Sequence, residues 1–242
     1  MSTSSPETLL PTSQPLPRYL QVSEMLGREI LAGHWRAGER IPTEPVLAAS
    51  LGVAVGTLRK AVAELEQRGM LERRQGSGTY VRTRAGRVKN IYEFFRLELL
   101  QGGGLPTAQI LAVDAAPLPT ALIAREQPAW HNGWRIRRLR ALNGTPVALE
   151  EIWIDQRHAL SPALSDALYQ FYKEQLGFWI ARVQDQLSVD ALPAWAPAAL
   201  GLEAGAPCTY IERQAWSNSQ VVEEVSRTWV HPQRARYCAR WP

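Results

Sequence analysis

The stretch from Glu39 to Val81 reads ERIPTEPVLAASLGVAVGTLRKAVAELEQRGMLERRQGSGTYV and decides the fold of the N-terminal part of the chain. Residues 43–51 begin with polar residues and carry Leu47 and Leu51 four positions apart. This spacing predicts a short helix, and the glycine that follows at position 52 ends it.

A second helix is expected from about residue 53 to residue 68. Its apolar positions recur at helical spacing, and they are Leu58, Ala61, Val62 and Leu65. Gly69 follows directly and is the kind of residue that ends a helix. With the apolar face turned inward, helical geometry directs another set of residues outward: Gly56, Arg59, Lys60, Ala63 and Gln67.

A short basic hairpin is expected after this helix. The runs 71–74 and 79–82 flank Gln75-Gly76-Ser77-Gly78, and a glycine-bearing loop between strand-like runs is a hairpin signal. Two helices joined by a tight turn and followed by a basic hairpin make a winged helix-turn-helix. In such a motif, Arg59 and Lys60 would face phosphates or base edges.

This stretch resembles the DNA-binding domain of GntR-type transcriptional regulators. The matching pieces are Ile30-x-x-Gly33, Ile41-Pro42-Thr43-Glu44, Leu51-Gly52-Val53, Thr57-Leu58-Arg59-x-Ala61 and Gln75-Gly76-Ser77-Gly78-Thr79-Tyr80-Val81. The resemblance implies a winged helix-turn-helix domain over residues 18–84. It also implies DNA contacts from Thr43, Glu44, Val55, Gly56, Thr57, Arg59, Lys60, Arg74, Gln75, Gly76, Ser77, Gly78 and Thr79.

Two departures from the family pattern bear on the operator sequence. Pro45 stands where the family usually has an arginine, and Ala54-Val55 replaces a usual Ser-Arg pair. Proline is sterically acceptable in a first helical turn, so the fold is retained. We expect fewer arginine–guanine contacts and more apolar contact, with Val55 or Thr57 against a thymine methyl group.

Composition and charge agree with a DNA-binding protein. The chain has 242 residues, of which 45% are hydrophobic, enough for one large or two small domains. Residues 18–87 carry 12 Lys and Arg against 7 Asp and Glu, whereas residues 88–242 carry 15 of each. The positive excess therefore lies on the part expected to bind DNA.

Two cysteines, at positions 208 and 238, are too few for a disulfide framework. The N-terminus lacks a signal-peptide pattern, and no stretch of eighteen apolar residues is present. We therefore expect a soluble cytoplasmic protein with no membrane partner. Residues 1–17 are rich in Ser, Thr and Pro and are expected to form a disordered arm, and residues 85–91 a linker.

The remainder of the chain predicts an antiparallel sheet with helices on one side, so the fold class is α+β. The hairpin signal Asn143-Gly144 joins strands expected at 133–142 and 145–155. Further strands are expected at residues 90–100, 106–115, 178–189, 207–217 and 220–231. Helices are expected at residues 18–32, 119–124, 161–176 and 194–200.

This half resembles the UTRA effector-binding domain of the histidine-utilisation-repressor (HutC) branch of GntR regulators, whose fold is similar to chorismate lyase. The matching pieces are Ile136-Arg137-Arg138-Leu139-Arg140, Pro146-Val147-Ala148-Leu149-Glu150, Leu200-Gly201-Leu202-x-x-Gly205-x-Pro207 and Glu224-Val225-Ser226-Arg227-x-Trp229. The resemblance implies an effector-binding domain over residues 92–242.

Arg138 and Arg140 are two residues apart on one strand, so they share a face and can clamp a carboxylate or phosphate. In the UTRA family the matching positions face the effector pocket, and Glu150 matches an acidic position on the partner strand. Glu224 and Arg227 on the last hairpin would complete the site, with Trp153 as an aromatic wall. The alternative is a salt-bridged, solvated face formed by residues 135–140 and 150–151.

The leading hypothesis is a ligand-responsive repressor that binds a two-fold double-stranded operator as a homodimer and responds to a small anionic metabolite. An enzyme built on the lyase-like half is the alternative, but a base–nucleophile pair is missing. Regulators fused to an aminotransferase need a longer chain, and an all-helical effector domain conflicts with the alternating runs. The four histidines lack metal-ligand spacing, and no cofactor motif is present.

Overall fold

The computed structural model describes residues 16–31, 33–82, 92, 94–120, 122, 128–160, 164 and 167–240. The expected linker at 85–91 lies outside the described residues, as do nearly all of the expected arm and most of the expected helix at 119–124. The described chain divides into two compact units. One comprises residues 16–107, 142–145 and 235–240, and the other comprises residues 108–141 and 146–234.

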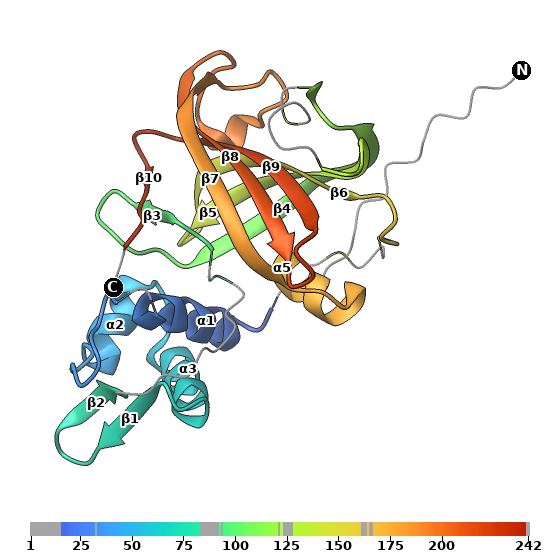
Figure 1. The fold of residues 1–242 in the computed structure, drawn as a ribbon. Coiled ribbons are helices and arrows are strands. Elements are labelled where there is room, and N and C mark those ends of the chain that lie inside the picture. The colour runs from blue at the N-terminus through green and yellow to red at the C-terminus, as the bar shows by residue number, and fades with distance from the viewer. Residues whose placement is uncertain are drawn as a thin grey trace, which may run out of the picture. The chain divides into compact units, whose positions relative to one another are not determined.

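Three helices and a hairpin form the N-terminal part of the first unit, which we call the head (Figure 1). The helices are α1 (Arg18–Leu31), α2 (Glu44–Ser50) and α3 (Val55–Gln67), and the hairpin is β1 (Leu71–Arg74) with β2 (Gly78–Val81). The chain bends by 107° between α2 and α3, within the range of a helix-turn-helix. The predicted winged helix-turn-helix is therefore confirmed.

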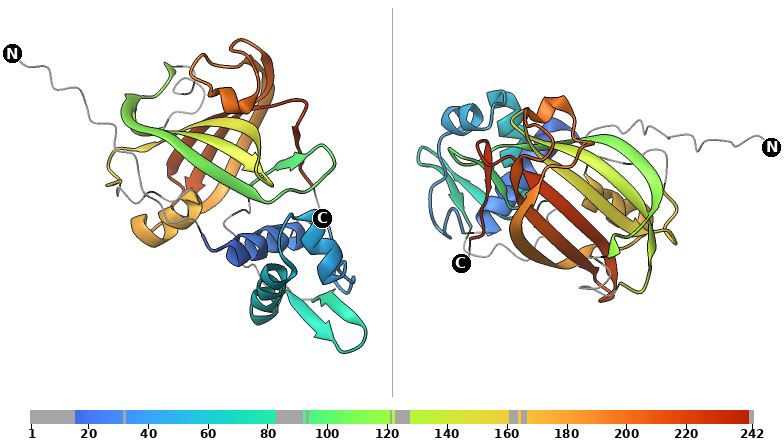
Figure 2. Two further views of the ribbon diagram at one scale, coloured as in Figure 1. Left: turned by 180° about the vertical axis from the view of Figure 1, so that it is seen from behind. Right: turned by 90° about the horizontal axis from the view of Figure 1, so that it is seen from above.

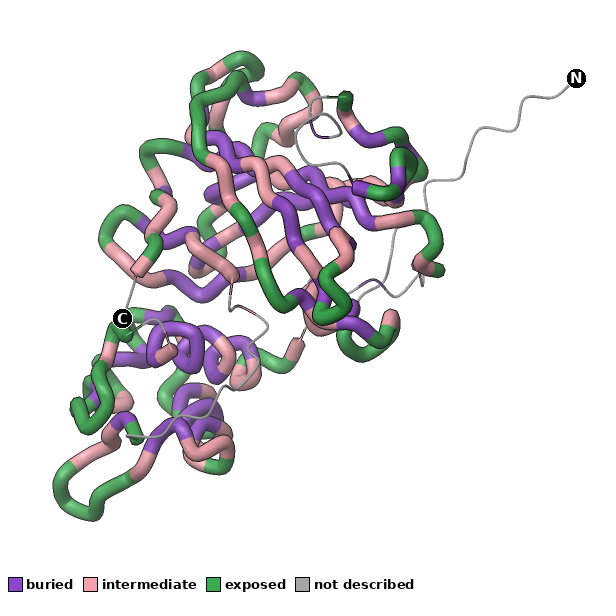
Figure 3. Tube along the Cα trace, viewed as in Figure 1, coloured by how far each residue is buried: buried purple, intermediate pink, exposed green. Residues whose placement is uncertain are grey.

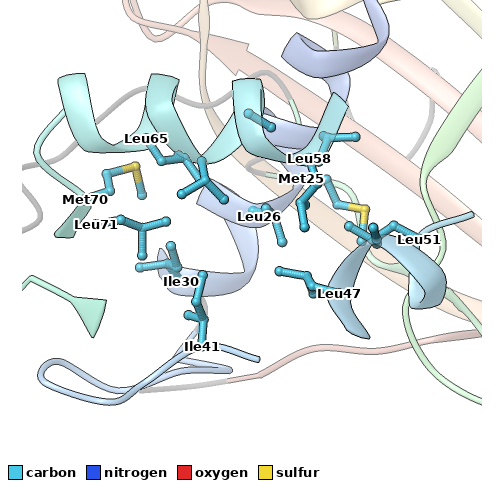
Figure 4. Close-up of a cluster of buried hydrophobic side chains, with 14 of the residues drawn as sticks. Met25, Leu26, Ile30, Ile41, Leu47, Leu51, Leu58, Leu65, Met70 and Leu71 are labelled. Atoms are coloured by element: carbon cyan, nitrogen blue, oxygen red, sulfur yellow. The ribbon is translucent and has the colours of Figure 1, made fainter. Parts of the chain in front are cut away.

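The core of the head is built from the apolar faces that the sequence pattern predicted (Figure 4). Met25, Leu26 and Ile30 of α1 pack with Leu58 and Leu65 of α3, and all are nearly inaccessible to solvent. Pro45 lies in the first turn of α2, where the N–H group that proline lacks has no partner in the helix. The departure from the family pattern at this position is therefore compatible with the fold.

The first unit also includes segments that are distant from the head in sequence. Strands β3 (Leu97–Leu99) and β10 (Ala235–Tyr237) pair antiparallel as a small separate sheet. The strand expected over residues 90–100 is thus wrong in its length. Only its last part is strand, because the pairing partner is a three-residue segment at the other end of the chain.

The second unit contains most of a six-stranded, curled sheet (Figure 2). Its strands are β4 (Pro106–Pro117), β5 (Asn132–Leu142), β6 (Thr145–Asp155), β7 (Ile180–Ala191), β8 (Pro207–Ser217) and β9 (Val222–Val230). They are hydrogen-bonded in the order β4-β5-β6-β9-β8-β7. Asn143 and Gly144 both have positive φ, as a two-residue hairpin turn requires, so the expected β5–β6 hairpin is confirmed.

The described helical segments of this half are α5 and two short turns. Of the helix expected at 161–176, the described part is α5 (Leu168–Phe171), which continues as a π-helical turn over Tyr172–Leu176 and ends at Gly177. The helix expected at 194–200 is wrong, because only Ala198–Leu200 forms a single 3₁₀ turn. Pro197 keeps the chain extended at that point and disfavours helical geometry in the residue before it.

Burial differs between the middle and one edge of the sheet (Figure 3). Strands β6 and β9 are buried along most of their length, whereas β7 is exposed along most of its length. Among the described residues, no single helix is long and apolar enough to cross a membrane; α2 and α3 meet the length and composition criteria only when joined across their bend.

Candidate DNA-binding surface and effector site

The outer face of α3 is exposed over Val55, Gly56, Arg59 and Lys60, as the helical periodicity predicted for the last three. Leu58, Ala61, Val62 and Leu65 point into the core, and this places Val55, Gly56, Arg59 and Lys60 at the exposed surface. Thr57 is half-buried at the start of the same helix. Helix α3 therefore offers a short apolar N-terminal patch followed by two cationic side chains.

The hairpin places the predicted wing residues at its exposed tip. The residues from Arg74 to Ser77 are exposed, and Gly78 and Thr79 are half-buried. Arg74 stacks on Tyr80, with its guanidinium carbon 4.4 Å from the ring centroid, and the hydroxyl oxygens of Ser77 and Tyr80 lie 2.6 Å apart. These contacts lie at the base of the loop whose residues the family resemblance placed among the DNA contacts.

A cleft with a volume of about 400 Å³ lies between the start of α2 and the wing. Thr43 and Glu44 line it from one side, and Arg73, Gln75 and Thr79 line it from the other. The Glu44 carboxylate accepts from Arg59 Nε at 3.1 Å and from Arg73 Nη2 at 2.9 Å. The predicted residues of α2, α3 and the wing are thus brought together on one surface.

Sequence reasoning missed two arginines at this surface, Arg40 and Arg73. Arg40 forms an antiparallel bridge with Tyr80, and its side chain lies over Gly78, where an added Cβ would come within 2.5 Å of Arg40 Nε. Gly78 also has a φ of +123°, a backbone conformation that favours glycine, whereas the Arg40 side chain could move away from an added Cβ. The position of Arg40, immediately before the Ile41-Pro42-Thr43-Glu44 motif, was the available signal.

A cluster of buried charges occupies one face of the large sheet. Arg138 and Arg140 of β5 are only 6% and 7% exposed. Arg138 donates to Glu150 Oε2 through Nη2 at 2.6 Å and through Nε at 3.1 Å, and Arg140 Nε lies 3.8 Å from the same oxygen. Burial disfavours a charged Glu150, but the two arginines outweigh it and hold the pKa of this carboxyl below its usual value.

The same face carries Glu224 of β9, which lies beneath α5 and the π-helical turn. Tyr172 donates to Glu224 Oε2 at 2.7 Å, and Tyr169 donates to Oε1 at 3.4 Å. Burial raises the pKa of Glu224, although Tyr172 and Arg138 act in the opposite direction. The cluster therefore holds one carboxyl that strongly favours its charged form and one that resists it.

Arg213 and Asp185 complete this cluster and were not predicted. Arg213 of β8 makes a two-pronged pair with Asp185 of β7, at 2.6 Å and 2.7 Å. The two residues are directly opposite in the β7–β8 ladder. No local sequence signal marks either residue, because the two lie 28 positions apart in the chain and only the register between β7 and β8 pairs them.

Two of the predicted effector residues lie on the opposite face of the sheet. Trp153 is three positions from Glu150 on β6, and Arg227 is three positions from Glu224 on β9, so strand alternation turns each away from the cluster. Arg227 lies over Trp153, with 5.0 Å between its guanidinium carbon and the ring centroid, and pairs with Glu151. The structure therefore brings together four of the six predicted residues: Arg138, Arg140, Glu150 and Glu224.

The second face carries the salt-bridged network that was the alternative interpretation of this region. Glu151 lies 2.9 Å from Arg137 Nε and 3.6 Å from Arg135 Nη1, and Arg135 also binds Asp114. The salt bridges of the alternative interpretation are therefore present on this face, although Glu151 is buried and not solvated. Within the described ranges, no three His, Cys, Asp or Glu side chains gather in a way that could hold a metal ion.

The fold defines a class of protein, in which a winged helix-turn-helix precedes a ligand-binding domain built on an antiparallel sheet. Residues 18–81 match the gntR family of bacterial regulatory proteins, and residues 101–236 match the UTRA domain. The chain belongs to the GntR family of transcriptional regulators, in the HutC branch that carries a UTRA domain. It is a ligand-responsive, DNA-binding regulator of transcription and not an enzyme.

Individual relatives agree with this assignment. The HTH-type transcriptional regulator SmoD of Agrobacterium fabrum is 43% identical over 95% of this chain and 98% of its own length. The histidine utilization repressor of Pseudomonas putida is 29% identical over 90% of this chain and 89% of its own length. The crystal structure of YydK from Bacillus subtilis, 21% identical, matches with a TM-score of 0.52 over 94% of this chain and all of its own, and supports the fold alone.

The Arg213–Asp185 pair gives a testable prediction about buried charge. Replacing only one partner, as Asp185→Leu or Arg213→Met, should lower the free energy of unfolding by about 3–5 kcal/mol, because the remaining charge loses its partner. The double variant should lose clearly less than the sum of the two single variants. Urea unfolding followed by tryptophan fluorescence measures all three. Additive losses would show that the two charges do not interact.

Proposed function

We propose that this regulator is a repressor that binds a two-fold operator as a homodimer through residues 18–84. A small anionic metabolite that binds within residues 92–242 changes the affinity of the protein for DNA. The observation that carries the proposal is the combination of an exposed cationic α3 face with a buried arginine cluster in the sheet. The histidine utilization repressor relative, by its name, supports the direction of regulation.

The DNA-binding surface in this proposal consists of the outer face of α3 and the wing. Arg59 and Lys60 are exposed and can reach phosphates or base edges when α3 enters the major groove. The exposed tip of the wing, from Arg74 to Ser77, is suited to contact with the flanking backbone. Val55 is 37% exposed at the start of α3, which supports apolar contact with a thymine methyl group.

The effector site in this proposal is the buried cluster around Arg138 and Arg140. Two guanidinium groups on one face suit a carboxylate or a phosphate, because both ligands accept two parallel hydrogen bonds. Glu150 and Glu224 lie beside them and can accept from hydroxyl groups of the same ligand. We therefore expect an effector with one anionic group and several hydroxyls, such as a sugar phosphate or a sugar acid.

The exposed edge of β7 supports a homodimer. Leu187 and Val189 are 50% and 74% exposed, and β7 is an edge strand of twelve residues. Long exposed edges with apolar side chains are templates for pairing with another strand. Two copies of β7 centred on Gln186 would place Arg182 opposite the partner copy's aspartate at position 190, which is a self-complementary arrangement.

Replacing Arg59 with alanine tests the DNA-binding surface. We expect the loss of about 1–3 kcal/mol of binding free energy, because one base or phosphate contact disappears. Fluorescence anisotropy on a duplex that the wild-type protein selects from a random-sequence pool measures this loss. Arg18→Ala, which removes the same charge from the exposed start of α1, should bind like wild type. Equal affinity for all three proteins would rule out α3 as the DNA-recognition helix.

Replacing Arg140 tests the effector site. A ligand present at a hundred times its Kd should stabilise the wild-type protein by about 2.7 kcal/mol, and thermal shift against a panel of sugar phosphates and sugar acids detects it. Arg140→Ala should abolish the shift, measured against its own Tm. Arg137→Ala is the matched control, because Arg137 lies three positions away on the same strand and binds Glu151 on the other face. A shift that survives in the Arg140 variant would contradict the assignment.

The β7 edge gives a prediction about assembly. Leu187→Lys combined with Val189→Lys should convert a dimer to a monomer, because two lysines introduce charge repulsion and desolvation at the paired edge. Light scattering after size-exclusion chromatography measures the mass. Val46→Lys is the control, since Val46 is 61% exposed in the head. An unchanged dimer in the double variant would place the interface elsewhere.

A further inference from the structure

One carboxylate in the head holds two arginines that come from different elements. Glu44, the first residue of α2, accepts from Arg59 of α3 through Oε2 at 3.1 Å. Its other oxygen, Oε1, accepts from Arg73 of β1 at 2.9 Å. Each carboxylate oxygen thus accepts from a different arginine, and the Glu44 side chain connects α3 to the wing.

Stability does not account for this arrangement. The side chains of Arg59 and Arg73 are 63% and 44% exposed, and ion pairs between such exposed groups contribute little to folding. Electrostatic attraction to DNA does not account for it either. A carboxylate among exposed arginines repels phosphate and cancels part of the positive charge that draws the head to any duplex.

The geometry points to a third role. We infer that Glu44 is a positioning residue that fixes the guanidinium groups of Arg59 and Arg73 before DNA arrives and thereby determines sequence selectivity. This inference rests on the proposed function of the head. Arginine has many rotamers, and immobilising it at an interface costs binding free energy. A side chain that is already held in place loses less freedom on binding.

The same carboxylate discriminates between duplexes. Non-specific binding depends on net charge, so Glu44 weakens it. Specific binding depends on guanidinium groups placed at defined base or phosphate positions, so Glu44 strengthens it. Glu44 also lines the cleft between α2 and the wing, where Arg73 and Arg74 lie across from it. Its effect should therefore appear in the ratio of specific to non-specific affinity.

The experiment compares three variants of the full chain on two duplexes, one selected by the wild-type protein and one of random sequence. Glu44→Gln should lower the selectivity ratio about tenfold, because Arg59 is released and Arg73 keeps only Glu66, which lies 3.5 Å from its Nε. Its non-specific affinity should also fall more steeply with salt, by about one unit in the slope of log K against the logarithm of salt concentration. Glu44→Asp keeps the charge but is too short to reach both arginines, so it should lose selectivity with the wild-type salt slope.

Glu39→Gln is the matched control. This substitution removes the same charge from an exposed position of the head, and the Glu39 carboxylate accepts from the backbone N–H of Arg36 at 2.9 Å. It should raise both affinities and leave their ratio unchanged. A wild-type ratio in both Glu44 variants, or an equal fall in the Glu39 variant, would overturn the inference while the proposed function stands. A wild-type protein without any preference for its selected duplex would overturn both.

Discussion

A charge can be buried within a sheet only when a partner of opposite sign lies close to it, and this constraint shapes the six-stranded sheet of the UTRA domain. An unpaired buried ion costs several kcal/mol, by order of magnitude, so arginines appear there together with carboxylates. Arg138 lies against Glu150, and Arg213 lies against Asp185. The two pairs are therefore neutral as a group.

Glu224 differs from Glu150 in the direction of its pKa shift. Burial raises the pKa of Glu224, although Tyr172 and Arg138 act in the opposite direction, whereas Arg138 and Arg140 hold the pKa of Glu150 below its usual value. Tyr172, which donates to Glu224, has a pKa raised well above its usual value and stays protonated as a donor.

Local patterns were sufficient to predict the head and the β5–β6 hairpin, because helical spacing, glycine stops and an Asn-Gly turn all act within a few residues. They failed at 194–200, where Pro197 outweighed the apolar spacing. Strand alternation alone predicts that Trp153 and Glu150 lie on opposite faces of the sheet, because they are three positions apart. The sequence therefore contained the signal that excludes Trp153 from the cluster. Asp185 and Arg213 could not be found, because only the β7–β8 register brings them together.

The connections between the two units follow from the path of the chain. β5 carries Arg138 and Arg140 and leads directly into residues 142–145, which belong to the same unit as the head. Within that unit, Asn143 donates to the carbonyl of Ser50 at the end of α2, with 3.4 Å between donor and acceptor. Strand β5 therefore continues, without a break in the chain, into a segment that contacts the end of α2.

The C-terminus makes a second connection of this kind. β9 carries Glu224 and is followed by β10, after which Arg240 binds Glu98 of β3 at 3.0 Å and lies 3.8 Å from Glu29 of α1. With the family's usual arginines absent at Pro45 and Val55, the selectivity of the head depends less on the number of guanidinium groups than on how firmly each is held. Glu44 performs that function at the surface of the head.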